Sequence, residues 1–218
     1  MGSDVFDQSK VMIWLTKFFY KRVWVKTIVK SREMLKKFPK AELIPNGVNF
    51  KDFYPVKKSE AISLTKLDPS CFNILFISTN PDSKVKNIKL AKEALSLLAN
   101  DKVKLTVISD IQHQELNYYY NAGNLLLLTS LSEGSPNVIK EAMACNCPIV
   151  ATDVGDIKSV IGETEDCYVT GFNSVEIAEK IKLVIKNNNR TNGRENIEYL
   201  ESNIIAKKII ALYQSVLK

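Results

Sequence analysis

Hydrophobic residues recur along this chain in two alternating rhythms. Short runs of strand-forming apolar residues predict strands over 72–78, 103–108, 125–130, 148–151 and 167–170. Apolar residues spaced three or four apart predict helices between them, as over 87–99, where Ile88, Ala91, Leu95 and Leu98 share one face. Strand and helix alternate in this way from residue 72 to 185. The pattern predicts an α/β fold with a doubly wound, Rossmann-like parallel sheet.

The two ends of the chain predict further elements. A helix over 12–20, a strand over 23–29 and a helix over 31–38 precede a lysine-rich linker at 57–68. After the sheet, Ser174 is expected to cap a helix, and a polar loop over 186–196 follows it. The last amphipathic helix is defined by Ile205, Ile209, Leu212 and Val216, and it is expected to pack on residues 11–40.

The segment 125–141, LLLLTSLSEGSPNVIKE, is the most informative stretch. Its leucines predict a strand buried on both faces, and Ser135 and Pro136 suit the cap and the first position of a helix. The turn between them lies at the carboxyl end of a strand and the amino end of a helix, where anions bind. Glu133 and Glu141 flank this turn with seven residues between them. Acids beside an anion site suit a ligand that also carries hydroxyl groups, and a nucleotide sugar has both.

The segments 133–144, EGSPNVIKEAMA, and 148–155, PIVATDVG, resemble the donor-site signature of the retaining glycosyltransferases of group 1, or family 4. That family has the GT-B architecture, in which two Rossmann-like domains face each other across a cleft. The resemblance implies transfer of a hexose from a nucleotide diphosphate sugar to a hydroxyl acceptor, as in polysaccharide biosynthesis, with no metal and no cofactor. It also implies that Glu133 contacts the donor sugar and Glu141 the ribose.

The same resemblance implies how the donor diphosphate is held. Lys86 matches a family lysine, and with Glu133 it is the expected catalytic group; the amides of the turn Gly134, Ser135, Pro136, Asn137 and Val138 are expected to bind the substrate. Asn80 stands where the family usually has an arginine. Lys84 then supplies the second charge, or Ser83 and Asn80 bind phosphate by hydrogen bonds alone, or donor binding is weaker. Ile111 and Gln112 are the candidates for contacts to the nucleobase.

The length of 218 residues leaves room for one such domain, since each needs on the order of 150 residues. We expect residues 1–42 to be a remnant of the first domain, 43–70 a hinge and linker, and 71–218 the donor-binding domain with its terminal helix. The hinge contains LIPNGVN at 43–49, which resembles the family's Pro-Asn-Gly-Val-Asp segment. The chain alone is then expected to bind nucleotide weakly and to turn over little. The alternative is a non-catalytic nucleotide-sugar-binding or scaffold subunit that pairs with a separate amino-terminal chain.

The net charge of +6 is spread along the chain, which argues against a nucleic-acid partner. Trp14, Phe18, Phe19 and Trp24 are expected either to pack against a domain or subunit outside this chain, or to contact a membrane surface through a basic aromatic helix. The apolar run 11–25 is interrupted by lysines and does not span a bilayer. We expect a cytoplasmic protein, with peripheral membrane association as the alternative.

Several other functions lose their support. No glycine-rich dinucleotide fingerprint follows the first strand and no Walker loop is present. The four cysteines lack metal-ligand spacing and are expected to be buried free thiols. His113 lies in a loop that opens a helix and is not expected to be a general base. A flavodoxin-like regulatory domain needs acids after the first strand, where this chain has Asn80-Pro81-Asp82-Ser83-Lys84.

Overall fold

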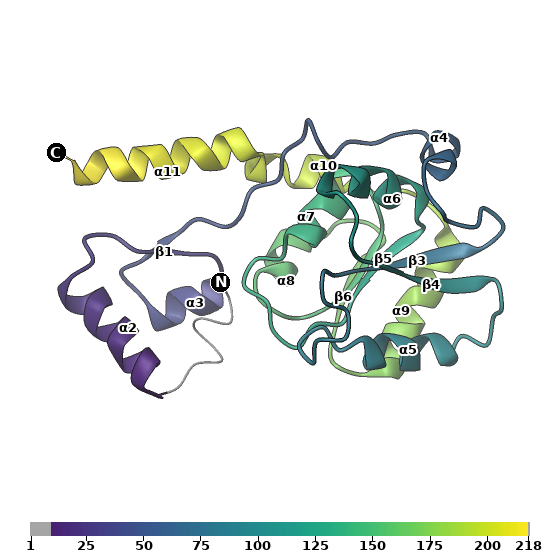
Figure 1. Cartoon of the computed structure of the whole chain (residues 1–218), viewed down its shortest axis with the longest axis horizontal. Helices are drawn as coiled ribbons and strands as arrows, with labels where there is room; N and C mark the ends of the chain where they lie inside the picture. The colour runs from purple at the N-terminus through teal and green to yellow at the C-terminus, as the bar shows by residue number, and fades with distance from the viewer. Residues whose placement is uncertain (1–9, 218) are drawn as a thin grey trace.

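The computed structural model describes residues 10–217, so residues 1–9 and Lys218 of the predicted first and last segments lie outside it. A five-stranded parallel sheet forms its centre, as predicted (Figure 1). The strands are β3 (Phe72–Ile77), β4 (Val103–Ile108), β5 (Leu125–Leu128), β6 (Ile149–Thr152) and β7 (Cys167–Thr170). They lie in the order β4-β3-β5-β6-β7.

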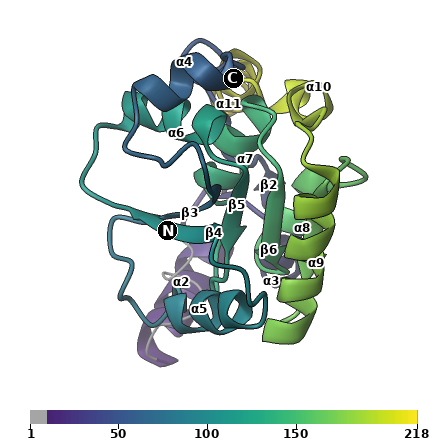
Figure 2. The same ribbon diagram turned by 90° about the vertical axis from the view of Figure 1, so that its right-hand side faces the viewer.

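Helices cover both faces of this sheet. One face packs on α5 (Ile88–Ser96) and α9 (Ser174–Asn187), which also contact each other (Figure 2). The other face packs on α6 (Leu116–Ala122), α7 (Asn137–Ala144) and α8 (Ile157–Ile161). Neighbouring strand residues alternate between the faces: Ile74 packs towards α5 and α9, whereas Leu75 packs towards the other helices. This alternation explains why the strands are apolar at every position.

The strand order places a topological switch point between β3 and β5. From β3 the chain crosses to β4 on one side and then returns past β3 to β5 on the other. The segment 109–116 contributes only the short helix η1 (His113–Glu115), with no extra strand. The loops that follow β3 and β5 therefore diverge from adjacent strands, which is where doubly wound sheets bind ligands.

The amino-terminal part forms a small separate layer. It consists of α2 (Lys10–Arg22), β1 (Ile28–Val29), α3 (Arg32–Lys37) and β2 (Glu42–Leu43), with β1 and β2 paired in parallel. Ser31 caps α3 by accepting a hydrogen bond from the Met34 amide. The prediction of a strand over 23–29 is wrong for residues 23–27, because among the described residues only β2 pairs with this segment, and it spans two residues.

Three predicted loop and cap assignments need correction. The predicted linker contains α4 (Lys58–Ser63), whose Ala61 is fully buried against α6. The predicted loop over 186–196 contains the end of α9 and the short α10 (Gly193–Asn196), followed by η2 (Glu198–Leu200). The α9 helix is capped by Asn173, whose side chain accepts from two amides, and Ser174 is its first residue.

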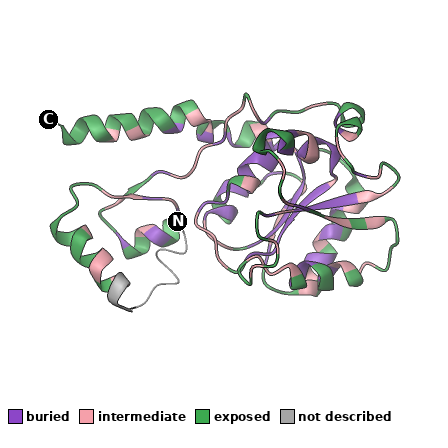
Figure 3. Cartoon of the chain, in the orientation of Figure 1, coloured by how far each residue is buried: buried purple, intermediate pink, exposed green. Residues whose placement is uncertain are grey.

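The terminal helix α11 (Ser202–Val216) extends away from the sheet past the amino-terminal layer and is mostly exposed, as is α2 (Figure 3). Ile205 is its one buried residue. No helix among residues 10–217 is both long and apolar enough to cross a membrane. Cys145, Cys147 and Cys167 are buried free thiols as expected, while Cys71 is half-buried. Burial raises the pKa of Cys167 to about 12.

Candidate donor site

The turn between β5 and α7 is held differently from the sequence prediction. The α7 helix begins at Asn137, so Pro136 takes the cap position and Ser135 lies one residue before it. The Ser135 hydroxyl makes no cap hydrogen bond; it donates to Asp156 at 2.5 Å instead. The first amides of α7 therefore stay without a side-chain cap, which leaves them available to an anion.

A buried lysine fixes the turn from below. The Lys140 side chain is fully buried, and its Nζ lies 2.8 Å from Ser135 Oγ and 3.1 Å from Asp156 Oδ2. Burial lowers the pKa of the Lys140 ammonium, and the Asp156 carboxylate partly offsets this effect. The cluster ties the turn to α7 and to the residue before α8, so the turn is rigid before any ligand binds.

The loop after β6 also supports the turn. Gly155 has φ +64°, and a Cβ atom there would lie 2.6 Å from the Gly134 carbonyl oxygen and 2.8 Å from that of Glu133. Only glycine fits both the left-handed backbone and this close approach. The glycine that ends PIVATDVG therefore has a structural reason: two loops touch through their backbones.

Lys86 and Glu133 meet across the switch point. Lys86 Nζ lies 2.7 Å from Glu133 Oε1, with the two side chains 32% and 17% exposed. The backbone joins the same loops, because Leu131 N donates to the Val85 carbonyl at 2.8 Å. The buried Thr129 hydroxyl also lies near the carbonyl oxygens of Lys86 and Asn87, at 3.1 and 3.0 Å. Residues 47 apart in sequence thus form one wall.

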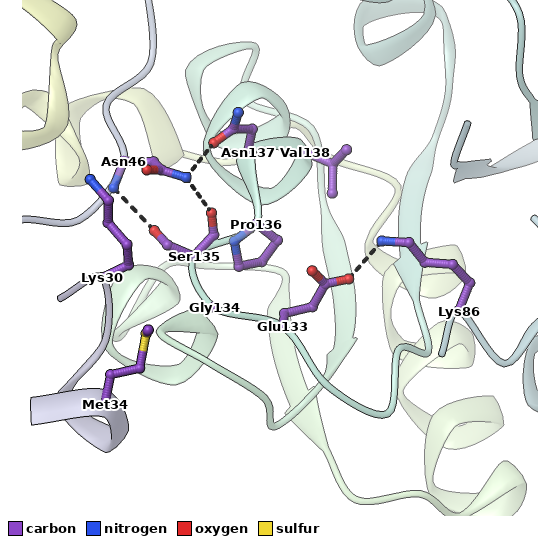
Figure 4. A pocket seen from close by; sticks show the side chains of 10 residues that line it. All are labelled: Lys30, Met34, Asn46, Lys86, Glu133, Gly134, Ser135, Pro136, Asn137 and Val138. Carbon is purple, nitrogen blue, oxygen red and sulfur yellow. Dashed lines mark hydrogen bonds and ion pairs between the residues drawn. The ribbon is translucent and has the colours of Figure 1, made fainter. Parts of the chain in front are cut away.

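A cavity of about 270 Å³, here called the donor cavity, opens beside this pair (Figure 4). Lys86, Glu133 and the turn Gly134, Ser135, Pro136, Asn137 and Val138 line it, as do Lys30, Met34 and Asn46. The sequence prediction brought the first seven of these residues together. It missed the last three, which come from the amino-terminal layer and the hinge.

Asn46 is the clearest of the missed residues. Its side-chain amide donates to the Ser135 carbonyl at 3.0 Å and to Asn137 Oδ1 at 3.1 Å, and its backbone N–H donates to Ser135 Oγ at 3.2 Å. The Pro45-Asn46-Gly47 turn was visible in the sequence as a hinge. Only the folded chain shows that the hinge grips the turn before α7.

Glu141 does not line the donor cavity. It is buried inside α7, where Tyr120 donates to Oε2 at 2.8 Å and His113 Nε2 lies 2.9 Å from Oε1. Burial, with the Glu141 carboxylate close by, raises the pKa of Tyr120 well above its usual value, so the hydroxyl stays a donor. The two acids of the signature thus lie on different sides of the amino end of α7.

The remaining predicted contacts lie around these groups. Asn80 and Lys84 are exposed and Ser83 is half-buried in the loop between β3 and α5, but none of them lines the donor cavity. Ile111 and Gln112 precede η1, close in sequence to the His113 that covers Glu141. No group of three or more His, Cys, Asp or Glu side chains within the described range is arranged to hold a metal.

Comparisons with known proteins agree with this arrangement. A family profile described as "Glycosyl transferases group 1" matches residues 83–200. TuaC of Bacillus subtilis, whose name assigns it to teichuronic acid biosynthesis as a glycosyltransferase, is 32% identical over 75 residues, or 34% of this chain and 19% of TuaC. The matches cover between 19% and 37% of the lengths of the curated relatives, so the chain spans a minor part of each.

Two solved structures show the same fold. Sucrose-phosphate synthase from Thermosynechococcus elongatus superposes with a TM-score of 0.85 at 21% identity, covering 100% of this chain and 64% of the synthase. HepE from Anabaena, in complex with UDP and glucose, superposes with a TM-score of 0.80 at 18% identity, covering 96% of this chain and 68% of HepE. The profile match spans more than half of this chain and includes the turn, Lys86 and both glutamates. This chain belongs to the group 1 family of glycosyl transferases.

Proposed function

We propose that this chain is the donor-binding half of a retaining glycosyltransferase that transfers a hexose from a nucleotide diphosphate sugar to a hydroxyl acceptor. One observation carries the proposal: the Lys86 ammonium and the Glu133 carboxylate, 2.7 Å apart, line one cavity with the uncapped amino end of α7. A cation and free amides suit a diphosphate, and a carboxylate suits sugar hydroxyls. Family membership and the UDP and glucose in the HepE structure support the same ligand class.

The chemistry of these groups is positioning and charge stabilisation. As the bond between the sugar and the diphosphate breaks, negative charge grows on the leaving diphosphate, and Lys86 with the amides of the turn stabilises it. Glu133, released from Lys86 by the incoming phosphate, accepts hydrogen bonds from the sugar. These groups need no metal ion. Because Ser135, Lys140 and Asp156 hold the turn in place, little reorganisation accompanies the reaction.

We propose further that Glu141 holds the ribose and that Ile111 and Gln112 lie near the nucleobase. The carboxylate is accessible only where His113 covers it, and both residues lie next to the segment that follows β4. Asn80, Ser83 and Lys84 lie outside the donor cavity, so they contact the diphosphate only if the loop moves towards it. Acceptor binding then falls to a partner domain or subunit.

Calorimetric titration with UDP, GDP and ADP sugars tests the proposal. We expect one of them to bind to the wild type, and Glu141→Ala to weaken that binding by about 1 to 3 kcal/mol, as for loss of a hydrogen bond to a charged group. Glu179→Ala, an exposed acid on α9, is the matched control and should bind as the wild type does. If none of the nucleotide sugars binds, or if both variants lose affinity equally, the proposal is wrong.

A second candidate is a non-catalytic nucleotide-sugar-binding subunit. It is favoured by Asn80, which is exposed where relatives carry an arginine and leaves Lys86 and Lys30 as the cations that line the donor cavity among the described residues. Transfer or hydrolysis of the bound nucleotide sugar separates the two candidates. Binding without turnover, even with a co-purified partner chain present, would favour the second.

A further inference from the structure

A second cavity, of about 200 Å³, adjoins the donor cavity through a shared residue. Lys30 lines both cavities. The walls of the second cavity come from the turn between β1 and α3, from the hinge, from α8 and from the carboxyl-terminal segment. Parts of the chain that are far apart in sequence therefore build one enclosed space, and we call it the Lys30 cavity.

Three cations line the Lys30 cavity. Lys30, Arg32 and Lys208 come from the β1–α3 turn and from α11, and within residues 10–217 none of them has an ion pair. The one acid in the lining is Asp156, and its carboxylate already accepts from Ser135 and Lys140. Burial lowers the pKa of Lys30, which shows that its ammonium lies partly out of water without a compensating anion.

The position of these cations in the fold also favours a ligand. Lys30 directly follows Val29 at the carboxyl end of β1, and β1 pairs in parallel with β2. The carboxyl ends of parallel strands are where α/β sheets bind ligands. The hydroxyl groups of Ser159 and Tyr199 face the same space as the cations. Lys30 stands between this space and the turn that carries Glu133, as Figure 4 shows for the donor side.

We propose that the Lys30 cavity binds a phosphate group carried by the acceptor, while a hydroxyl of the same acceptor points past Lys30 into the donor cavity. The proposal rests on the donor site proposed above. A compact anion with close to two negative charges matches three unpaired cations around a small space. An extended nucleic acid does not, because it requires a long basic surface. The acceptor is therefore a phosphorylated molecule, either a soluble sugar phosphate or a phospholipid-linked one.

Binding of inorganic phosphate and pyrophosphate, followed by NMR with and without saturating UDP, tests this site. We expect phosphate to bind in the presence of UDP, and Arg32→Gln or Lys208→Gln to weaken it by about tenfold, since each removes one charge-assisted hydrogen bond. Lys36→Gln on α3 and Lys207→Gln on α11 are matched controls, because both lysines are exposed and neither lines the cavity. UDP affinity should stay unchanged in all four variants, which also confirms that they fold.

The outcomes separate this inference from the proposed function. Displacement of phosphate by UDP, or an equal loss in the control variants, would overturn the second site. Loss of UDP binding with phosphate binding retained would overturn the donor site alone. A soluble hexose phosphate and vesicles that contain phosphatidic acid then distinguish the two sources of the phosphate group. Binding to either one supports the inference, and failure of both contradicts it.

Discussion

The His113 imidazole nitrogen Nε2 lies 2.9 Å from Glu141 Oε1 and covers a carboxylate that is otherwise enclosed by the protein. The His113 side chain is 63% exposed and the Glu141 side chain 4%. Tyr120 holds the other carboxylate oxygen from inside the fold. Of the two partners, only His113 lies at the surface and can be displaced. A ribose that uses Glu141 therefore has to take the place of the imidazole.

Removing this imidazole should strengthen nucleotide binding. We expect His113→Ala to bind UDP several-fold more tightly than the wild type, because the ribose hydroxyls no longer compete for Oε1. The chain has a single histidine, so its ring signals in an NMR spectrum are unambiguous and should shift when UDP is added. Tyr120→Phe is the comparison: it leaves Oε2 unpaired and should lower the free energy of unfolding by about 1 to 3 kcal/mol. Unchanged histidine signals at saturating UDP would argue against displacement.

Changes to Lys86 and Glu133 should affect different parts of the donor. Lys86→Met should weaken UDP binding about tenfold while uridine binding stays the same, because the ammonium serves the diphosphate. Glu133→Gln should leave UDP affinity unchanged or slightly higher and should reduce the preference for UDP-sugar over UDP. Both variants should unfold within about 1 kcal/mol of the wild type, since partly exposed ion pairs add little stability. Calorimetry with the three ligands measures these differences, and equal losses for all three would contradict the assigned roles.

The contact between Gly155 and the turn should be sensitive to a single methyl group. Gly155→Ala places a Cβ atom 2.6 Å from the Gly134 carbonyl oxygen at a residue with φ +64°. Gly162→Ala is the matched control, with φ +53° and no atom within 4 Å of the added Cβ. Both variants carry backbone strain of about 1 to 3 kcal/mol, so the extra loss in Gly155→Ala reports the clash. We expect that variant also to lose nucleotide binding. Equal stability of the two variants by chemical denaturation would contradict the contact.

The buried Lys140 should make stability depend on pH and on its partner. Lys140→Met leaves the Asp156 carboxylate without a cation and should cost about 3 kcal/mol, whereas adding Asp156→Leu should recover part of that loss. Because burial lowers the pKa of Lys140 below 10.5, the unfolded state binds more protons between the two pKa values. The wild type should therefore gain stability relative to Lys140→Met as the pH rises from neutrality towards 10.5. A flat difference between their unfolding free energies would show that the ammonium is not desolvated.

The amino-acid sequence was enough to place the strands of the sheet and the turn at 133–138. Those features depend on local patterns: leucines at every position of β5, glycine and proline at fixed places in the turn, and apolar spacing in α5 and α9. The division into residues 1–42, 43–70 and 71–218 remains a prediction. Errors arose where a local pattern had a non-local competitor. Ser135 looks like a helix cap, but its hydroxyl bonds Asp156 and Lys140 instead.

The tertiary structure decided which of these groups face one another. The strand order brings Lys86 to Glu133, the hinge brings Asn46 to Ser135, and α6 and η1 turn Glu141 towards Tyr120 and His113. Such contacts join residues that are 21 to 89 positions apart. Sequence spacing specifies the face of an element because helix and strand periods are local. It does not specify which element packs against that face, since this depends on how the whole core buries its apolar surface.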